Sequence, residues 1–255
     1  MKAPMIDHYS LATLPLEMRF GGVSLSWGTG FIWQHAEQFY LITNWHNVSG
    51  RDPFSQNHLS PTAAEPDRLH IVWNEKGSTG KVPAELPIRG MDGEPLWLIH
   101  PALGNKVDVV AVPVKPPPDA DPYPINHMPS GGLLLQIGMD VFILGYPFGI
   151  GPHGLPVWKR GSIATEPNVI NHERPFILVD SASRPGMSGS PVIRRTVDYH
   201  PMESGELTQS AGTMTRLVGV YSGRLATNDP NDPQLGLTWP IGFVEEIITG
   251  KIVDS

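Results

Sequence analysis

Residues 184–192 have the sequence RPGMSGSPV and lie between two short apolar runs. Ser188 stands close to Gly186 and Gly189, so neighbouring side chains do not crowd its hydroxyl. In a tight loop, the backbone N–H groups of Gly186 and Ser188 can converge on one point, like the donor pair that stabilises the tetrahedral intermediate of acyl transfer. A Gly/Ser/Pro turn between two strands would explain the same residues. The rest of the sequence has to distinguish a nucleophile loop from such a turn.

Glycine and proline are unusually frequent, with 27 of each among 255 residues, well above average usage. They are spread between short apolar runs, and no repeat accounts for them. This pattern predicts many short strands joined by turns. The length is enough for one large all-β or α/β unit, or for two domains of roughly 100–150 residues each.

Charge and cysteine content limit the partners and the compartment. The formal net charge of -7 argues against binding to nucleic acid or to an anionic membrane surface, which would favour a basic face. The chain has no cysteine, so we expect a reducing compartment and a cytoplasmic location. The N-terminal residues lack the continuous apolar segment of a signal peptide, and no run approaches the 18 apolar residues of a membrane span.

Short apolar or alternating runs predict strands in two groups. The first group comprises residues 23–27, 38–43, 69–73, 96–99 and 108–114, and the second comprises residues 140–147, 158–164, 176–180, 191–193, 217–223 and 236–240. The predicted parts of the chain are an N-terminal arm (1–19), a first β unit (20–115), a proline-rich interdomain linker (116–131), a second β unit (132–241), and a C-terminal helix and tail (242–255). Pro4 and Pro15 argue against a helix in the arm.

Two further residues occupy strand ends in the first unit. His46 follows the apolar strand 38–43, and Asp108 begins the strand 108–114. Side chains at such positions are held by a rigid scaffold and can face a cleft. The chain order is therefore His46, Asp108 and Ser188, divided between the two units by the linker, and a cleft between the units would allow all three side chains to meet.

At these residues the sequence resembles a known family. Residues 41–48, 108–112 and 185–192 resemble the histidine, aspartate and serine motifs of chymotrypsin-fold (trypsin-like) serine proteases. Within this family the sequence most resembles disulfide-free bacterial members such as the HtrA protease domain, since residues 146–149 and 159–163 are similar to the opening of their second barrel. The matches span roughly residues 20–245 in the family's order.

The resemblance implies an all-β fold of two six-stranded antiparallel β-barrels, with the active site in the cleft between them and a short C-terminal helix. It implies a serine endopeptidase that acts on protein or peptide substrates without a cofactor. Ser188 would attack the carbonyl carbon, His46 would take its proton and pass it to the leaving group, and Asp108 would fix the tautomer of His46. The N–H groups of Gly186 and Ser188 would form the oxyanion hole.

The resemblance also implies a set of substrate-binding residues, which are Ala182, Ser183, Tyr221, Ser222, Gly223 and Arg224. Ala182 falls where trypsin-like enzymes place the aspartate that selects Lys or Arg, so we expect a small or apolar residue before the scissile bond. Because Arg224 is positively charged, an acidic residue before the scissile bond stays an alternative. Met187 occupies the position where activated digestive proteases have an aspartate, so zymogen activation through a new N-terminus is not expected.

Other classes of site fit less well. An α/β-hydrolase requires Gly-x-Ser-x-Gly and the order Ser, acid, His, whereas Ser190 holds the last place here. Residues 74–81 lack the first glycine of a phosphate-binding loop, and no His-Glu-x-x-His motif is present, so we expect no metal site. Two alternatives stay open: a latent protease that needs an activating protein partner, and a pseudo-protease that binds peptides without cleaving them.

Overall fold

The first half of the chain builds one antiparallel sheet in the computed structural model, which describes residues 6–169, 175–225 and 234–255. Its strands are β1 (Thr13–Phe20), β2 (Val23–His35), β3 (Gln38–Thr43), β4 (Arg68–Glu75), β5 (Lys81–Pro87), β6 (Leu98–Ile99), β7 (Val110–Val114), β8 (Ala120–Asp121) and the C-terminal β15 (Ile252–Val253). They follow the order β15-β6-β7-β3-β2-β1-β4-β5, with β8 paired to β4. This sheet is the first unit.

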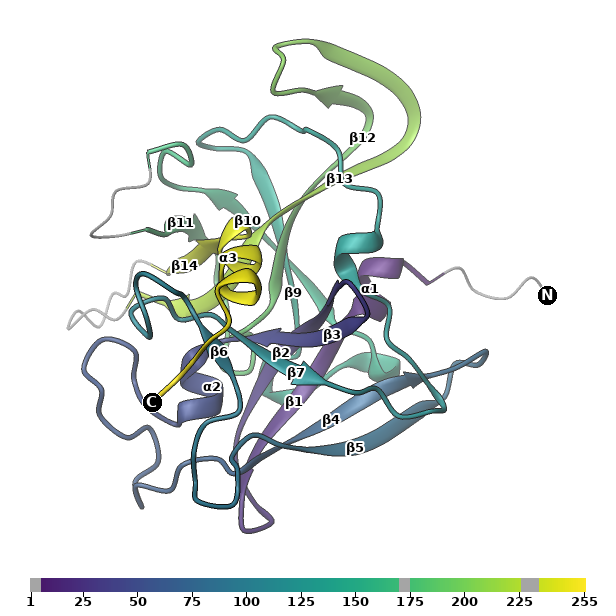
Figure 1. The fold of residues 1–255 in the computed structure, drawn as a ribbon. Coiled ribbons are helices and arrows are strands. Elements are labelled where there is room, and N and C mark those ends of the chain that lie inside the picture. The colour runs from purple at the N-terminus through teal and green to yellow at the C-terminus, as the bar shows by residue number, and fades with distance from the viewer. Residues whose placement is uncertain (1–5, 170–174, 226–233) are drawn as a thin grey trace.

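The second half forms a closed six-stranded barrel, which is the second unit. Its strands are β9 (Asp140–Gly145), β10 (Val157–Ile163), β11 (Ile177–Asp180), β12 (Pro191–Pro201), β13 (Leu207–Arg224) and β14 (Leu235–Pro240). The barrel order is β10-β11-β14-β13-β12-β9. Figure 1 shows that β12 and β13 continue beyond the barrel as a projecting hairpin.

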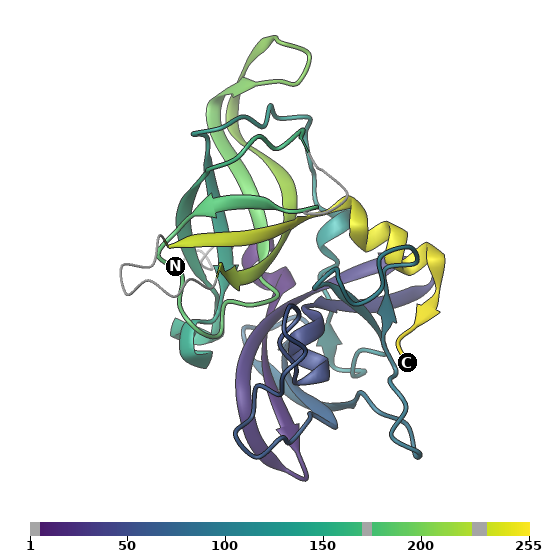
Figure 2. The same ribbon diagram turned by 90° about the vertical axis from the view of Figure 1, so that its left-hand side faces the viewer.

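The helical segments are short. They are the helices α1 (His8–Ala12), α2 (Trp45–Ser49) and α3 (Gly242–Gly250), and the 3-10 turns η1 (Ile125–His127), η2 (Pro147–Gly149) and η3 (Pro152–Gly154). In Figure 2 the two units lie one above the other, and α3 lies beside the place where they meet. The predicted C-terminal helix is confirmed.

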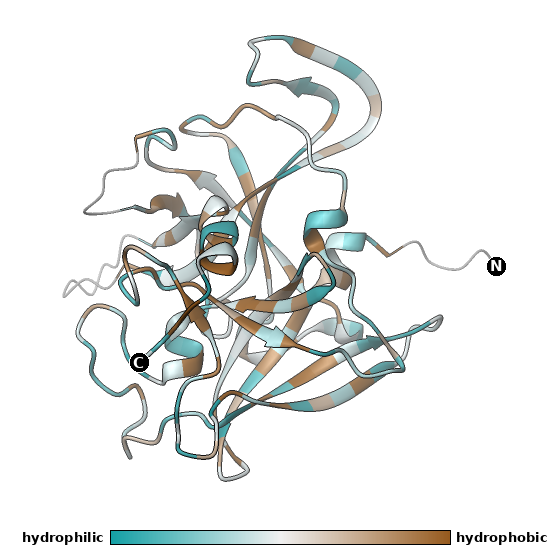
Figure 3. Ribbon diagram, in the orientation of Figure 1, coloured by the Kyte–Doolittle hydropathy of each residue, from teal (hydrophilic) through white to brown (hydrophobic). Residues whose placement is uncertain are grey.

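Alternation of apolar and polar residues explains how the strands pack. In β4, Leu69, Ile71 and Trp73 are buried while the residues between them are partly exposed, which is the period-2 pattern of a strand with one covered face. In Figure 3 hydrophobic residues are concentrated along the strands of both units, and the connecting loops are mainly pale or hydrophilic. One apolar cluster combines residues of both units with Val244, Ile247 and Ile248 of α3, so α3 closes a core that the two units share.

The fold class is confirmed, and three details of the predicted organisation need correction. The prediction of an N-terminal arm at residues 1–19 is wrong for residues 8–19. The helix α1 and the strand β1 lie there, and Leu14, Leu16 and Met18 are buried. The first unit has nine strands in place of six, partly because β15 returns from the C-terminus to pair with β6. The linker 116–131 connects the two units but is more than an extended spacer, since β8 and η1 lie within it and Asn126 exchanges hydrogen bonds with the backbone of Gln34.

Candidate active site

The helix α2 positions His46 directly after strand β3. Asn44 is the N-cap residue of α2, but its side chain makes no capping hydrogen bond. Its amide Nδ2 instead donates to the backbone oxygen of Asp108 at 2.6 Å. The start of the helix is therefore tied to the segment that leads into β7.

Asp108 is fully buried and holds His46 through two contacts. Its Oδ1 accepts the backbone N–H of His46 at 2.9 Å, and its Oδ2 lies 2.7 Å from His46 Nδ1. The hydroxyl of Ser222, from strand β13 of the second unit, also donates to Oδ2. Because a carboxylate only accepts hydrogen bonds, the proton of neutral His46 lies on Nδ1 and Nε2 is left with a lone pair.

The pKa of His46 is raised above its ordinary value of 6.5. Burial is the largest influence and lowers this pKa, but the negative charge of Asp108, its hydrogen bond and the more distant charge of Asp52 together outweigh burial. The surroundings of His46 therefore favour the imidazolium form, as required of a group that takes up a proton during a reaction.

The loop that carries Ser188 depends on a glycine with positive φ. Gly186 has φ 95°, and a Cβ added there would lie 2.4 Å from the backbone oxygen of Tyr146. The N–H of Phe148 donates to the oxygen of Pro185 at 2.7 Å. Since the C=O and N–H of a trans peptide point in opposite directions, the N–H of Gly186 points away from Phe148. Among the described residues, no group accepts a hydrogen bond from the N–H of Gly186 or of Ser188.

Thr29 of strand β2 fixes this loop from the first unit. Its N–H donates to the backbone oxygen of Ser188 at 2.8 Å, and its hydroxyl donates to the oxygen of Gly186 at 2.8 Å. The side chain of Thr43 in turn donates to the oxygen of Thr29 at 2.8 Å, and Asn47 Nδ2 donates to Ser188 O at 3.2 Å. The shape of the serine loop is thus determined by residues of both units.

The structure brings His46, Gly186 and Ser188 together on the wall of one cavity of about 260 Å³. Asp108 lies behind His46 and does not reach this cavity. A buried carboxylate is thus in direct contact with an imidazole, and a half-buried serine hydroxyl lies on the wall of the same cavity as that imidazole.

The predicted substrate-binding residues have different surroundings. Gly223 lies beside Ser188, since a Cβ added to Gly223 would be 3.7 Å from Ser188 Oγ. Ala182 is half-buried and Arg224 is exposed. Ser183, Tyr221 and Ser222 are buried. The hydroxyl of Ser183 bonds that of Tyr221, and the hydroxyl of Ser222 faces Asp108.

Several residues around the site were not predicted from the sequence. Thr29, Asn44 and Asn47 hold the serine loop or the aspartate, and Asp52 raises the pKa of His46. Asn44 and Asn47 flank His46 in the sequence, and that adjacency was the one available signal. Nothing in the local sequence of Thr29 indicates its role.

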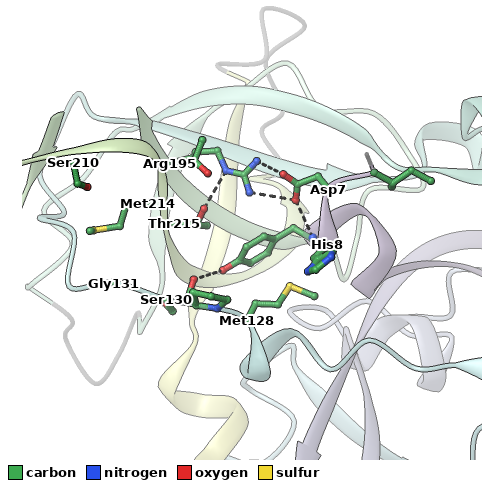
Figure 4. A pocket seen from close by; sticks show the side chains of 13 residues that line it. Asp7, His8, Met128, Ser130, Gly131, Arg195, Ser210, Met214 and Thr215 are labelled. Carbon is green, nitrogen blue, oxygen red and sulfur yellow. Dashed lines mark hydrogen bonds and ion pairs between the residues drawn. The ribbon is translucent and has the colours of Figure 1, made fainter. Parts of the chain in front are cut away.

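A second cavity, of about 620 Å³, contains none of these residues (Figure 4). It lies between the start of α1 and the β12–β13 hairpin. Arg195 on its wall pairs with Asp7 at 2.5 Å, donates to Thr215 at 3.0 Å and packs over the rings of Tyr9 and Trp158. These contacts hold α1 against the second unit.

Two further properties concern cofactors and membranes. Within residues 6–169, 175–225 and 234–255, the structure contains no group of three or more His, Cys, Asp or Glu side chains that could hold a metal ion. None of the helices in that same part of the chain is both long and apolar enough to cross a membrane.

Residues 28–198 match the family model of the trypsin-like peptidase domain. Since this is well over half of the sequence, the chain belongs to the trypsin-like peptidase family. It is a serine endopeptidase, and its substrates are peptides or proteins.

Solved structures agree on the fold. The active form of the Rv3671c protease from M. tuberculosis is 18% identical with a TM-score of 0.51, over 97% of this chain and 83% of that one. A serine endoprotease from Yersinia pestis is 14% identical with a TM-score of 0.50, over 97% of this chain and 67% of that one. At these identities the likeness concerns the fold. Among curated proteins, no match to the sequence is found.

Proposed function

We propose that Ser188, His46 and Asp108 form a catalytic triad that hydrolyses peptide bonds through a covalent acyl-enzyme. The observation that supports this most strongly is the double contact of the Asp108 carboxylate with His46, on the wall of the cavity that also contains Ser188. A histidine held in this tautomer presents Nε2 as a base, and a serine in the same cavity is its natural proton donor.

The reaction has two halves. Ser188 Oγ attacks the carbonyl carbon and its proton passes to His46 Nε2, while the N–H groups of Gly186 and Ser188 donate to the developing oxyanion. The C–N bond then breaks, the leaving amine takes the proton from His46, and the acyl group stays on Ser188. Water, deprotonated by His46, releases the acid and restores the hydroxyl.

The orientation of the oxyanion loop bears on whether an activating partner is needed. The hydrogen bond from Phe148 N–H to Pro185 O and the two contacts of Thr29 orient the serine loop so that no group in the described part of the chain accepts from the N–H of Gly186 or Ser188. This supports a protease that is competent without an activating partner.

Labelling with a fluorophosphonate, which phosphonylates activated serines, tests the triad. We expect the wild type to be labelled on the peptide that contains Ser188, and Ser188→Ala to abolish labelling. Ser190→Ala is the matched control, because it removes a hydroxyl two residues away. A folded wild type that resists the probe, or labelling that persists in Ser188→Ala, would contradict the proposal.

A further inference from the structure

Tyr221, one of the residues expected to contact the side chain before the scissile bond, packs into the core of the second unit. Its ring is fully buried, and its hydroxyl bonds Ser183. A Cβ added to Gly236 on strand β14 would lie 2.3 Å from the Tyr221 ring. The ring therefore occupies the space between Ser183 and β14, and little room is left there for a large substrate side chain.

The open space lies on the other side of Ser188. The cavity shared by His46 and Ser188 is completed by Leu25 and Trp27 of strand β2 and by the loop at residues 59–66, whereas Gly223 and Arg224 do not line it. In the proposed reaction, the acyl group stays on Ser188 and His46 passes its proton to the leaving nitrogen. The half of the substrate that leaves must therefore lie next to His46, where this cavity opens.

The lining of this cavity defines the chemistry that it can accept. Among the described residues its lining has no Asp, Glu, Lys or Arg, and its polar side chains beside His46 and Ser188 are the neutral Ser26, Asn47 and Ser60. Leu59 and Trp27 expose 53% and 42% of their surface. The Trp27 ring packs on Gly149, where an added Cβ would lie 2.5 Å from it, so the ring is held in place although it is exposed. A dry cavity of about 150 Å³ can hold benzene, so a cavity of about 260 Å³ leaves room for one leucine or phenylalanine side chain beside the scissile bond at Ser188.

We infer that this enzyme selects its substrates mainly by an apolar side chain on the residue after the scissile bond, held by Leu25, Trp27 and Leu59. The residue before the scissile bond is then small, because Tyr221 closes the space on that side. This inference rests on the proposed function and adds the substrate class to it.

Acyl transfer to added amines measures the leaving side directly. An N-acyl alanine ester forms the acyl-enzyme, and an amino acid amide then competes with water for it. The amine forms a C–N bond to the acyl carbon and gives a proton to His46, and the Ser188 Oγ–carbon bond breaks with return of the proton to Ser188. The ratio of amide to acid product, measured by mass spectrometry, does not depend on how fast the acyl-enzyme forms.

We expect leucinamide and phenylalaninamide to be acylated about tenfold better than glycinamide or the α-amide of aspartic acid. In Leu59→Asp this preference should be lost. Leu207→Asp is the matched control, because Leu207 is also exposed but lies on the projecting hairpin, and it should keep the wild-type preference. Equal transfer to all four amides, or a preference for leucinamide that survives in Leu59→Asp, would overturn the inference.

The acyl side is tested by comparing an alanine ester with a phenylalanine ester of the same alcohol. The alanine ester should acylate the enzyme about tenfold faster, and equal rates would show that Tyr221 does not close this side. Fluorophosphonate labelling separates the two levels of failure. An enzyme that is labelled but shows no preference among the amides would contradict the inference and still support the triad. A folded enzyme that is not labelled would contradict both the triad and the inference.

Discussion

Asp254 Oδ2 accepts the indole N–H of Trp45 at 2.7 Å. The same oxygen accepts the indole N–H of Trp97 at 3.0 Å, so two buried tryptophans depend on one carboxylate. Trp45 directly precedes His46 in α2, and strand β15 brings Asp254 to this place by pairing with β6. The C-terminal segment therefore braces the helix that carries the histidine.

Removing this carboxylate should destabilise the protein. In Asp254→Ala both indole N–H groups lose their acceptor in the interior, and an unsatisfied buried donor costs about 1–3 kcal/mol. Urea unfolding should show a decrease of this size. Asp92→Ala is the control, because Asp92 is exposed and its carboxylate bonds nothing among the described residues. Equal effects of the two substitutions would show that the Asp254 contact adds no stability.

The acid limb of the pH–activity profile reports on His46. The proposed reaction needs neutral His46, so activity falls as the pH drops through its pKa, and because this pKa is raised the fall should begin above pH 6.5. Asp52→Asn removes one of the charges that raise the pKa and should move the acid limb of kcat/KM to lower pH. Asp92→Asn serves as control. An acid limb that stays in place, or moves to higher pH, would show that Asp52 does not act on His46.

Ser190 offers a substitution that should not harm the protein. Its hydroxyl is fully buried and has no hydrogen-bond partner in the described part of the chain. A buried polar group without a partner is unfavourable, so Ser190→Ala should leave the thermal unfolding midpoint unchanged or raise it. Ser183→Ala, which removes a bonded hydroxyl, should lower stability by about 1 kcal/mol. A clear loss of stability in Ser190→Ala would mean that its hydroxyl has a partner after all.

Gly189 lies at the contact between the serine loop and β2, and a substitution there tests the importance of this contact. Its φ is 87°, and a Cβ there would lie 2.0 Å from the backbone oxygen of Thr29. Gly189→Ala should displace the loop and reduce the rate of fluorophosphonate labelling by at least about 10²-fold. Gly212→Ala has a similarly positive φ of 102° but open space around it, so it carries the backbone strain without the clash. Its labelling rate should match the wild type, and a loss as large as that of Gly189→Ala would show that the clash with Thr29 is not the cause.

Local patterns in the sequence were sufficient for the motifs around His46, Asp108 and Ser188 and for many of the strands, but not for β5, β8 and β15 or for the outer parts of β12 and β13. Strand β1 was missed because Pro15 interrupts it. Pro15 is tolerated because its partner on β2, Thr29, directs its backbone N–H and C=O to Ser188 and Thr43, and because the pairing of β1 with β4 begins only at Leu16. No bond to either strand therefore requires an N–H at residue 15.

Contacts between distant segments could not be predicted from local patterns. No feature of residues 251–255 indicates that the chain returns to the first sheet. Tyr221 was expected at the substrate, but whether a side chain next to a cleft points into it or into the barrel depends on strand register and on neighbours such as Gly236. The cytoplasmic location stays a prediction.

Thr29 and Gly186 are 157 residues apart, and yet one hydrogen bond joins them. The two units consequently cannot be treated as interchangeable modules. A hybrid that combined the second unit with the first unit of a distant relative would keep two complete units, but it would inherit the loop around Ser188 without the residue against which that loop is shaped. Exchange of halves between such enzymes should succeed only where the partner of the loop is exchanged with it.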